Sequence, residues 1–206
     1  SMLRYKLIYF PIRGRGEVAR QLFYLAGVPF KDDRITISEW SSLKAKTPFG
    51  QLPVLEVDGH QLAQSFAIFR YLAQEFGFAG DSPLEALWVD VTADQHKEYE
   101  NKIKPALRFQ GSEEEKEQLM RNVAEPARDK YFPLLEKIAE EHGSSGHFVG
   151  ASLTWVDLLI AEHASILLKQ FPGFLDRYPT VLAIVDAILS TPKLKEWLEK
   201  RPDTAF

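Results

Sequence analysis

The feature that most constrains the fold is a proline followed at once by a short strand, a tight turn and a polar helix start, within residues 53–65. Pro53 lacks a backbone N–H and has a fixed φ, so it belongs at the first residue of a strand or in a turn. Residues 54–57 are a strand candidate, and Asp58-Gly59 is a strong signal for a two-residue hairpin turn. Ser65 is suited to the N-cap of the apolar-periodic helix that follows. The stretch therefore predicts a hairpin that leads directly into a helix.

The same stretch predicts a binding site. X-Pro bonds adopt the cis form at low cost, and a cis Leu52–Pro53 bond would turn the Leu52 amide and carbonyl toward open space. A helix N-terminus beside that exposed backbone edge favours a small peptide with a free carboxylate.

Composition excludes several classes of function. The 206 residues suffice for one large domain or two small ones, and the net charge of −4 argues against a general nucleic-acid surface. The absence of cysteine excludes disulfides, cysteine-based zinc sites, a cysteine nucleophile and a thioredoxin-type Cys-x-x-Cys redox centre. No apolar run approaches the ~18 residues of a transmembrane helix, so we expect a cytoplasmic protein without a membrane partner.

The pattern along the chain predicts an α/β part followed by an all-helical part. Strands are expected over 4–10 and 30–37, with a helix over 17–26 that Gly27 ends. An irregular piece, the hairpin and a helix ending near Gly77 follow. After Pro83 everything is predicted helical, which sets a first domain over 1–79 and a second over 84–206.

Helix starts in the second part are marked by capping signals. Ser112-x-x-Glu115 and Thr154-x-x-Asp157 resemble capping boxes, and Asp157 is interpreted as structural. His142 and His147 flank a Gly/Ser turn and are expected to be solvated.

Tyr9 is the first candidate for chemistry. It lies at the end of the first predicted strand, just before the turn Arg13-Gly14-Arg15-Gly16 and a helix start. Ligands of α/β domains bind where strands end and helices begin, and a phenol at that point can donate a hydrogen bond to an anion.

Taken together, these motifs resemble the cytosolic glutathione transferases. The resemblance rests on Tyr9, the Arg13–Glu17 turn, Pro48-Phe49-Gly50-Gln51-Leu52-Pro53, Gln64-Ser65 and Thr154-Trp155-Val156-Asp157, and it spans essentially the whole chain. It is closest to the sigma class, and especially to its nematode members. The resemblance implies a thioredoxin-like N-terminal domain, a helical C-terminal domain and a homodimer.

The resemblance also implies a glutathione site. Tyr9 would stabilise the thiolate with help from Arg15, and Leu52 would pair with the cysteinyl backbone. The residues implied to contact glutathione are Tyr9, Trp40, Lys44, Gln51, Leu52, Pro53, Gln64, Ser65 and, from the partner subunit's copy, the position of Glu98. Trp40 and Lys44 would hold the glycine end, and Gln64 and Ser65 the γ-glutamyl end.

The neighbouring electrophile site would be apolar. Its candidate residues are Phe10, Ile12, Gly14, Leu159, His163 and Phe206. Sigma-class prostaglandin D synthase gathers several acids where this chain has Asp94, Lys97 and Glu98, and Lys97 replaces a carboxylate with a cation. The histidines show no His-x-x-x-His spacing, so we predict no metal.

The leading hypothesis is an enzyme that conjugates glutathione to hydrophobic electrophiles, as in detoxification. Two alternatives keep the glutathione site: a glutathione-dependent prostaglandin isomerase, and a non-catalytic carrier of haem or other apolar ligands. The aromatic pair of the prostaglandin enzyme is replaced here by Pro105 and Leu159. A purely structural role, as in the lens crystallins derived from this fold, is disfavoured because Tyr9 and the glutathione contacts are all present.

Overall fold

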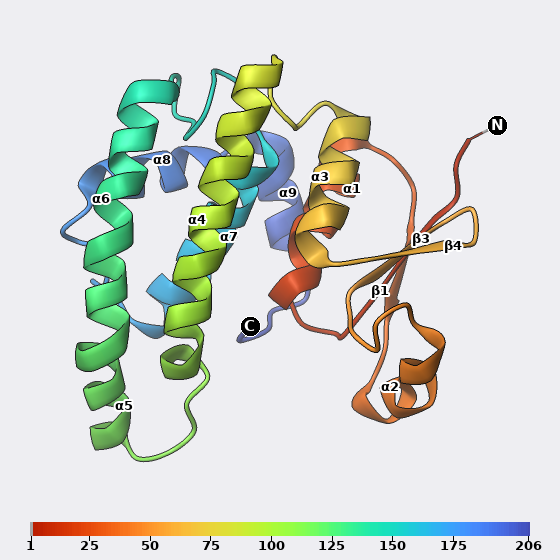
Figure 1. Ribbon diagram of the computed structural model, residues 1–206, viewed down its shortest axis with the longest axis horizontal. Coiled ribbons are helices and arrows are strands. Elements are labelled where there is room, and N and C mark those ends of the chain that lie inside the picture. The colour runs from red at the N-terminus through yellow and green to blue at the C-terminus, as the bar shows by residue number, and fades with distance from the viewer. Residues whose placement is uncertain (1) are drawn as a thin grey trace. The chain divides into compact units, whose positions relative to one another are not determined.

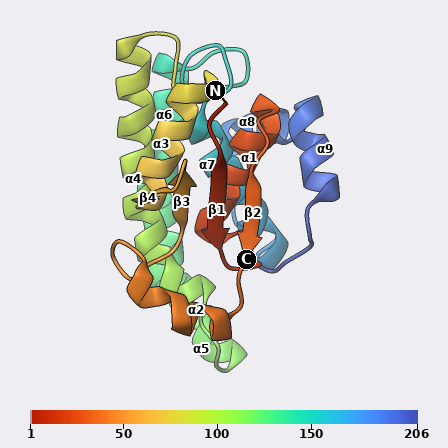
Figure 2. The same cartoon turned by 90° about the vertical axis from the view of Figure 1, so that its right-hand side faces the viewer.

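The computed structural model describes residues 2–206. Figure 1 labels most of its helices and strands, and Figure 2 also labels β2. The chain divides into two compact units, Ser1–Ala79 together with Leu189–Phe206, and Gly80–Ile188. The last helix thus associates with the first unit, whereas the sequence predicts domains over 1–79 and 84–206. That domain division stays a prediction.

The first unit is built on a four-stranded sheet with the order β2-β1-β3-β4. Its strands are β1 (Tyr5–Tyr9), β2 (Lys31–Arg34), β3 (Val54–Val57) and β4 (His60–Ala63). β1 runs parallel to β2 and antiparallel to β3, and β3 pairs with β4 in an antiparallel hairpin. The order of elements is the predicted strand–helix–strand followed by strand–strand–helix, and it is a thioredoxin-like arrangement.

Helices α1 (Glu17–Ala26) and α3 (Ser65–Phe76) pack against each other, and α9 (Pro192–Lys200) packs on α1. Figure 2 shows α2 (Ile37–Leu43) beyond the ends toward which the β1 and β2 arrows point. The C-terminal ends of these parallel strands are the edge at which ligands bind in open α/β sheets.

The predicted turns and stops are confirmed. Val57 pairs with His60 across the hairpin, and Asp58 and Gly59 have φ of 48° and 85°. Positive φ at both central residues is the geometry of a type I′ turn. Gly27 ends α1 with φ 66°, and its N–H donates to the carbonyls of Phe23 and Tyr24.

The irregular piece expected after the second strand is wrong, because it contains α2. Ile37, expected in that strand, begins the helix instead, and β2 already ends at Arg34. Thr36 caps α2: its N–H donates to Glu39 Oε2 at 2.6 Å, and Glu39 N–H donates to Thr36 Oγ1 at 3.2 Å. None of the residues of α2 is fully buried, and only its partly buried Trp40 and Leu43 pack against the apolar cluster of the sheet, so periodicity gives this short helix a weak signal. The capping box Thr36-x-x-Glu39 was the available signal.

The second unit is helical, as predicted. Its helices are α4 (Pro83–Leu107), α5 (Glu113–Leu119), a π-helical turn (Met120–Ala124), α6 (Glu125–His142), α7 (Trp155–Gln170) and α8 (Pro179–Leu189), whose last residue falls in the first unit. α4 packs on both α6 and α7, and α4 and α6 run side by side in Figure 1. None of the helices within residues 2–206 is long and apolar enough to cross a membrane.

Asp157 has the structural role expected of it. Its carboxylate is fully buried and accepts hydrogen bonds from the backbone N–H of Thr154 at 3.0 Å and of Phe148 at 2.9 Å. It also lies 3.1 Å from His147 Nδ1. The expectation that both histidines of this turn are solvated is therefore wrong: His147 pairs with Asp157, and His142 stacks on Trp88 with ring centroids 3.7 Å apart. Helix packing, which the local sequence does not encode, covers them.

Candidate active site

Tyr9 ends β1 with its ring buried and its phenol oxygen held by the backbone. The Arg15 N–H donates to Tyr9 Oη at 3.0 Å. A Cβ at Gly14 would lie 2.5 Å from Tyr9 Oη, and one at Gly16 would lie 2.7 Å from Tyr9 Cδ1. The two glycines therefore allow the turn after β1 to wrap closely around the phenol.

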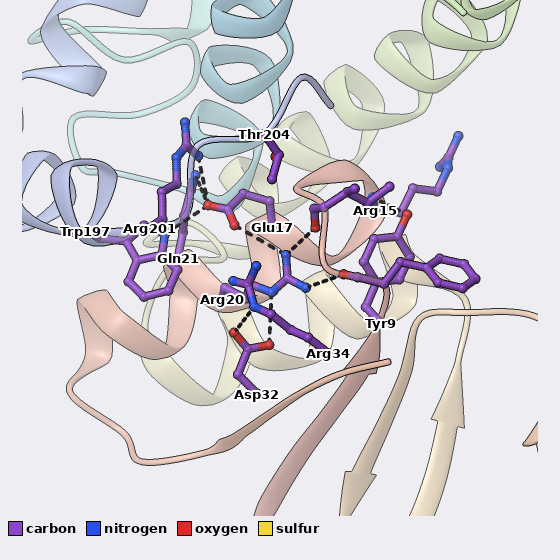
Figure 3. Close-up of polar contacts among 12 residues, drawn as sticks. Tyr9, Arg15, Glu17, Arg20, Gln21, Asp32, Arg34, Trp197, Arg201 and Thr204 are labelled. Atoms are coloured by element: carbon purple, nitrogen blue, oxygen red, sulfur yellow. Dashed lines mark hydrogen bonds and ion pairs between the residues drawn. The ribbon is translucent and has the colours of Figure 1, made fainter. Parts of the chain in front are cut away.

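A buried arginine, which the sequence did not single out, holds this turn in place. Arg20 on α1 is fully buried and donates to the carbonyl of Ile12 at 2.6 Å and of Phe10 at 3.1 Å, as Figure 3 shows. It also donates to Asp32 Oδ1 at 3.1 Å. Arg20 thus ties the segment after β1 both to α1 and to β2.

Glu17, three residues before Arg20, closes the same network. Its Oε2 accepts hydrogen bonds from Trp197 Nε1 and Arg201 Nη1, both at 2.9 Å, and its Oε1 lies 3.6 Å from Arg20 Nη1. The i,i+3 spacing on one helix was the only sequence signal for this pair.

The C-terminal residues reach the same turn. Arg13 N–H donates to the Phe206 carbonyl at 2.7 Å, and Arg13 Nη2 donates to the Thr204 carbonyl at 2.9 Å. The structure thus brings Phe206 next to the turn that carries Ile12 and Gly14. All three residues are among those expected around the electrophile.

A second group of expected site residues meets over a small apolar cluster. Phe10, Trp40 and Leu52 all pack against buried Ile8, Ile35 and Val54. The Phe10 and Trp40 rings meet edge to face, with centroids 6.2 Å apart. The Leu52–Pro53 bond is cis, as the sequence suggested, and Pro53 is buried. Lys44 is exposed, with its aliphatic chain next to Gly50.

The start of α3 differs in detail from the expectation. Gln64, not Ser65, occupies the N-cap, and Ser65 is the first helical residue and is buried. Gln64 has φ 73° and ψ 111°, a strained conformation for a residue with a side chain. Its Nε2 lies 3.4 Å from Gln51 Oε1, so the structure brings Gln51, Gln64 and Ser65 together. The Arg15 guanidinium approaches the same helix start, 5.9 Å from the centre of the Phe66 ring.

The remaining candidates belong to the second unit. Leu159 and His163 lie one turn apart on α7, and both are buried. His163 Nε2 lies 3.3 Å from Tyr99 Oη. Glu98 is exposed on α4, as are Asp94 and Lys97.

Known families and structures match both parts of the chain. The model of the glutathione S-transferase N-terminal domain matches residues 5–74, and that of the glutathione S-transferase C-terminal domain matches residues 97–201. Glutathione S-transferase 1 of Ascaris suum is 45% identical over the whole of both chains.

Two solved structures of glutathione transferases extend the comparison. A Nu-class glutathione transferase from Haemonchus contortus is 46% identical with a TM-score of 0.90, and the match covers all of both chains. A glutathione S-transferase of the hookworm Necator americanus, described as monomeric, is 46% identical with a TM-score of 0.93 and covers 98% of this chain and all of its own.

The chain therefore belongs to the glutathione S-transferase family, among its nematode members. It is a glutathione transferase, and glutathione is the co-substrate of the family. Members of this family are typically dimeric and act on electrophilic substrates.

Proposed function

We propose that this protein conjugates the glutathione thiolate to hydrophobic electrophiles, with Tyr9 donating a hydrogen bond to the sulfur. The thiol proton leaves to solvent, the thiolate attacks the electrophilic carbon, and a C–S bond forms as the leaving group departs with its electron pair. With a polarised double bond, the carbanion formed by the attack takes up a proton from solvent instead. Detoxification of apolar compounds in the cytoplasm is the role that fits this chemistry.

The observation that carries the proposal is the hydrogen bond from Arg15 N–H to Tyr9 Oη. A phenol whose oxygen already accepts one hydrogen bond donates its own proton more strongly, because hydrogen bonds in a chain polarise one another. The glycine turn also prevents the buried ring from turning away, so the donor is held in place before substrate binds.

The hydrogen bond from Tyr9 and the nearby helix N-terminus can together supply the free energy needed to lower the pKa of the glutathione thiol. A free thiol has a pKa of ~8.5, and lowering it by roughly 2 units requires about 2.7 kcal/mol of preference for the thiolate. A hydrogen bond to a charged acceptor contributes about 1.5–3 kcal/mol. A nearby helix N-terminus adds about 0.3–1 kcal/mol. Tyr9 can therefore be the main contribution, with Arg15 and the helix start adding to it.

The rest of glutathione would be bound by backbone and polar groups of the first unit. Leu52 would pair with the cysteinyl backbone beside buried Pro53. Gln64 and Ser65, with Gln51 next to them, would hold the γ-glutamyl end at the start of α3. Trp40 and Lys44 would hold the glycine end.

We propose a homodimer in which Glu98 faces the γ-glutamyl amine bound by the other subunit. Glu98 is exposed on α4, and the family is typically dimeric, which supports this role. The residues that we propose for contact with the electrophile, as the resemblance implies, are Phe10, Ile12, Gly14, Leu159, His163 and Phe206.

The test compares glutathione conjugation to a general chromogenic aryl electrophile in the parent protein and in Tyr9→Phe. We expect glutathione to bind nearly as well but conjugation near neutral pH to fall on the order of 10-fold to 100-fold, which corresponds to losing about 1.5–3 kcal/mol of thiolate stabilisation. The ultraviolet absorbance of bound thiolate should appear at higher pH in the variant.

Tyr24→Phe is the matched control, because Tyr24 lies on α1 of the same unit and its hydroxyl accepts a hydrogen bond from Lys200. Its rate should equal that of the parent. An unchanged rate in Tyr9→Phe would overturn the role of Tyr9. A parent protein that binds glutathione without conjugation would instead favour the isomerase or the carrier of haem and other apolar ligands.

A further inference from the structure

The second unit contains a buried group of histidine and carboxylate side chains with no role in stabilising the thiolate, although one of them, His163, is also among the residues proposed to contact the electrophile. His96 and Glu100 lie one turn apart on α4, and His163 faces them from α7. Both histidines are buried, and Glu100 is 23% exposed. The sequence predicts no metal because its histidines lack ligand spacing, but helix packing brings these three residues together.

The distances within this group are unusual for hydrogen bonds. Glu100 Oε1 lies 3.4 Å from His96 Nε2 and 3.5 Å from His163 Nδ1. Hydrogen bonds to a carboxylate from a charged nitrogen are about 2.7–2.9 Å long. Among residues 2–206, His96 Nε2 has no hydrogen-bond partner although it is fully buried.

The same distances fit a shared metal ion. Zinc binds nitrogen at about 2.0–2.1 Å and carboxylate oxygen at about 2.0–2.2 Å, so two ligand atoms at the tetrahedral angle lie about 3.4 Å apart. One ligand atom from each of the three residues lies within 4.8 Å of the other two. Small side-chain rotations would therefore bring all three atoms onto one ion.

The outer nitrogens of both imidazoles are already oriented. His96 Nδ1 lies 2.9 Å from Tyr131 Oη, and His163 Nε2 lies 3.3 Å from Tyr99 Oη. Histidines that bind metals almost always donate their second ring N–H to an oxygen acceptor, usually a carboxylate, a carbonyl or water, which directs the other nitrogen at the ion. A phenol oxygen can accept the same hydrogen bond.

We propose that His96 Nε2, His163 Nδ1 and the Glu100 carboxylate bind a zinc-type divalent transition metal, with a fourth position filled by water. Two imidazoles and one carboxylate form a recognised zinc ligand set. Magnesium and calcium are excluded, because they take six or more ligands that are mainly oxygen. This site is distinct from the exposed Asp94, Lys97 and Glu98, where no metal is predicted.

The test is a titration of tag-free, chelator-treated protein with Co²⁺, followed by displacement with Zn²⁺. We expect the visible absorption of tetrahedral cobalt to saturate at one equivalent and to disappear when zinc is added. Glu100→Gln keeps the size of the side chain but removes the charge, and it should weaken binding on the order of 100-fold. Tyr131→Phe removes only the outer hydrogen bond and should weaken it about 10–100-fold.

His60→Gln is the matched control, because His60 is exposed on the β-hairpin, and it should bind cobalt like the parent. X-ray absorption of the zinc-loaded parent should show two imidazole nitrogens and needs no variant to fold. Failure of the parent to bind cobalt, parental affinity in Glu100→Gln, or loss of binding in His60→Gln would each overturn the proposal. The three side chains would then form only a hydrogen-bonded network.

Discussion

Single residues decide how closely the chain approaches the Tyr9 phenol. Gly14 and Gly16 have no side chain where any Cβ would collide with the ring, and Gly14 also has φ 41°. The sequence motif Arg-Gly-Arg-Gly predicts a turn with close backbone approach, and the structure identifies the phenol as the group approached. Because the phenol is the proposed catalytic donor, these glycines serve the reaction as well as the fold.

His147 predicts a pH dependence at the residue scale. Its hydrogen bond to Asp157, and secondarily the charge of that carboxylate, raises the pKa of His147 despite partial burial. A raised folded-state pKa stabilises the fold fully below the unfolded value of ~6.5, and that stabilisation is lost as the pH rises through the folded value. The free energy of unfolding contributed by His147 should therefore fall as pH rises above ~6.5.

Urea denaturation across this pH range checks the prediction. His147→Gln should lose the decrease in unfolding free energy above pH ~6.5 that His147 contributes, since glutamine does not titrate. His60→Gln should retain that decrease, because His60 is exposed. Glu136 and Glu140 line the same surface hollow as His147. Identical pH profiles for the parent and His147→Gln would refute the assignment.

At the scale of an element, the attachment of α1 to the segment after β1 and to β2 depends on Arg20. Replacement by methionine keeps the bulk of the side chain but leaves the carbonyls of Ile12 and Phe10 without their donor and Asp32 without one of its partners. Breaking a buried ion pair typically costs about 3–5 kcal/mol. We expect Arg20→Met to destabilise the protein by about 3 kcal/mol and to weaken glutathione conjugation, as measured by chemical denaturation and initial rates.

Arg34→Met is the matched control, because Arg34 donates to the other oxygen of Asp32, at 2.9 Å, from a partly exposed position. Partly exposed pairs contribute at most about 1 kcal/mol, so this variant should stay close to the parent. Equal losses in the two variants would show that the carbonyls held by Arg20 contribute little.

At the scale of the whole molecule, we predict that Phe49 contributes to the interface of the proposed homodimer. Its side chain is 65% exposed in the loop before Pro53. The resemblance implies that an aromatic residue of this loop enters the partner subunit, as in some glutathione transferase classes, although this contact is less developed in sigma-like proteins. Burying a phenylalanine contributes about 1.5–3 kcal/mol, and a two-fold dimer would bury two of them, so Phe49→Ser should weaken the proposed dimer by roughly 100-fold to 10,000-fold. Sedimentation velocity at falling protein concentration measures the change.

Ile37→Ser is the control for Phe49, since Ile37 is 70% exposed in the same unit without an implied contact. It should leave the dimer intact. A dimer equally stable in Phe49→Ser would remove this contact, and a monomeric parent would match the hookworm relative described as monomeric.

The sequence by itself determined the turns, helix caps and strand ends that depend on interactions between residues only a few positions apart. The Asp58-Gly59 turn, the stop at Gly27, the Ser112–Glu115 capping box and the strand end at Tyr9 all follow from steric and hydrogen-bonding rules that act over a few positions. The resemblance of these linked motifs to glutathione transferases is borne out by the family match. The helix α2 could have been predicted from Thr36 and Glu39, since its cap is equally local.

Only the tertiary structure decided which polar groups are buried together. Arg20 meets Ile12, Phe10 and Asp32, and His163 meets His96 and Glu100, because helices and strands far apart in the chain pack against each other. Sequence spacing determines which residues share a helix face, but not which face of another element lies opposite. The electrostatics of the turn around Tyr9 and of the proposed metal site arise at that level.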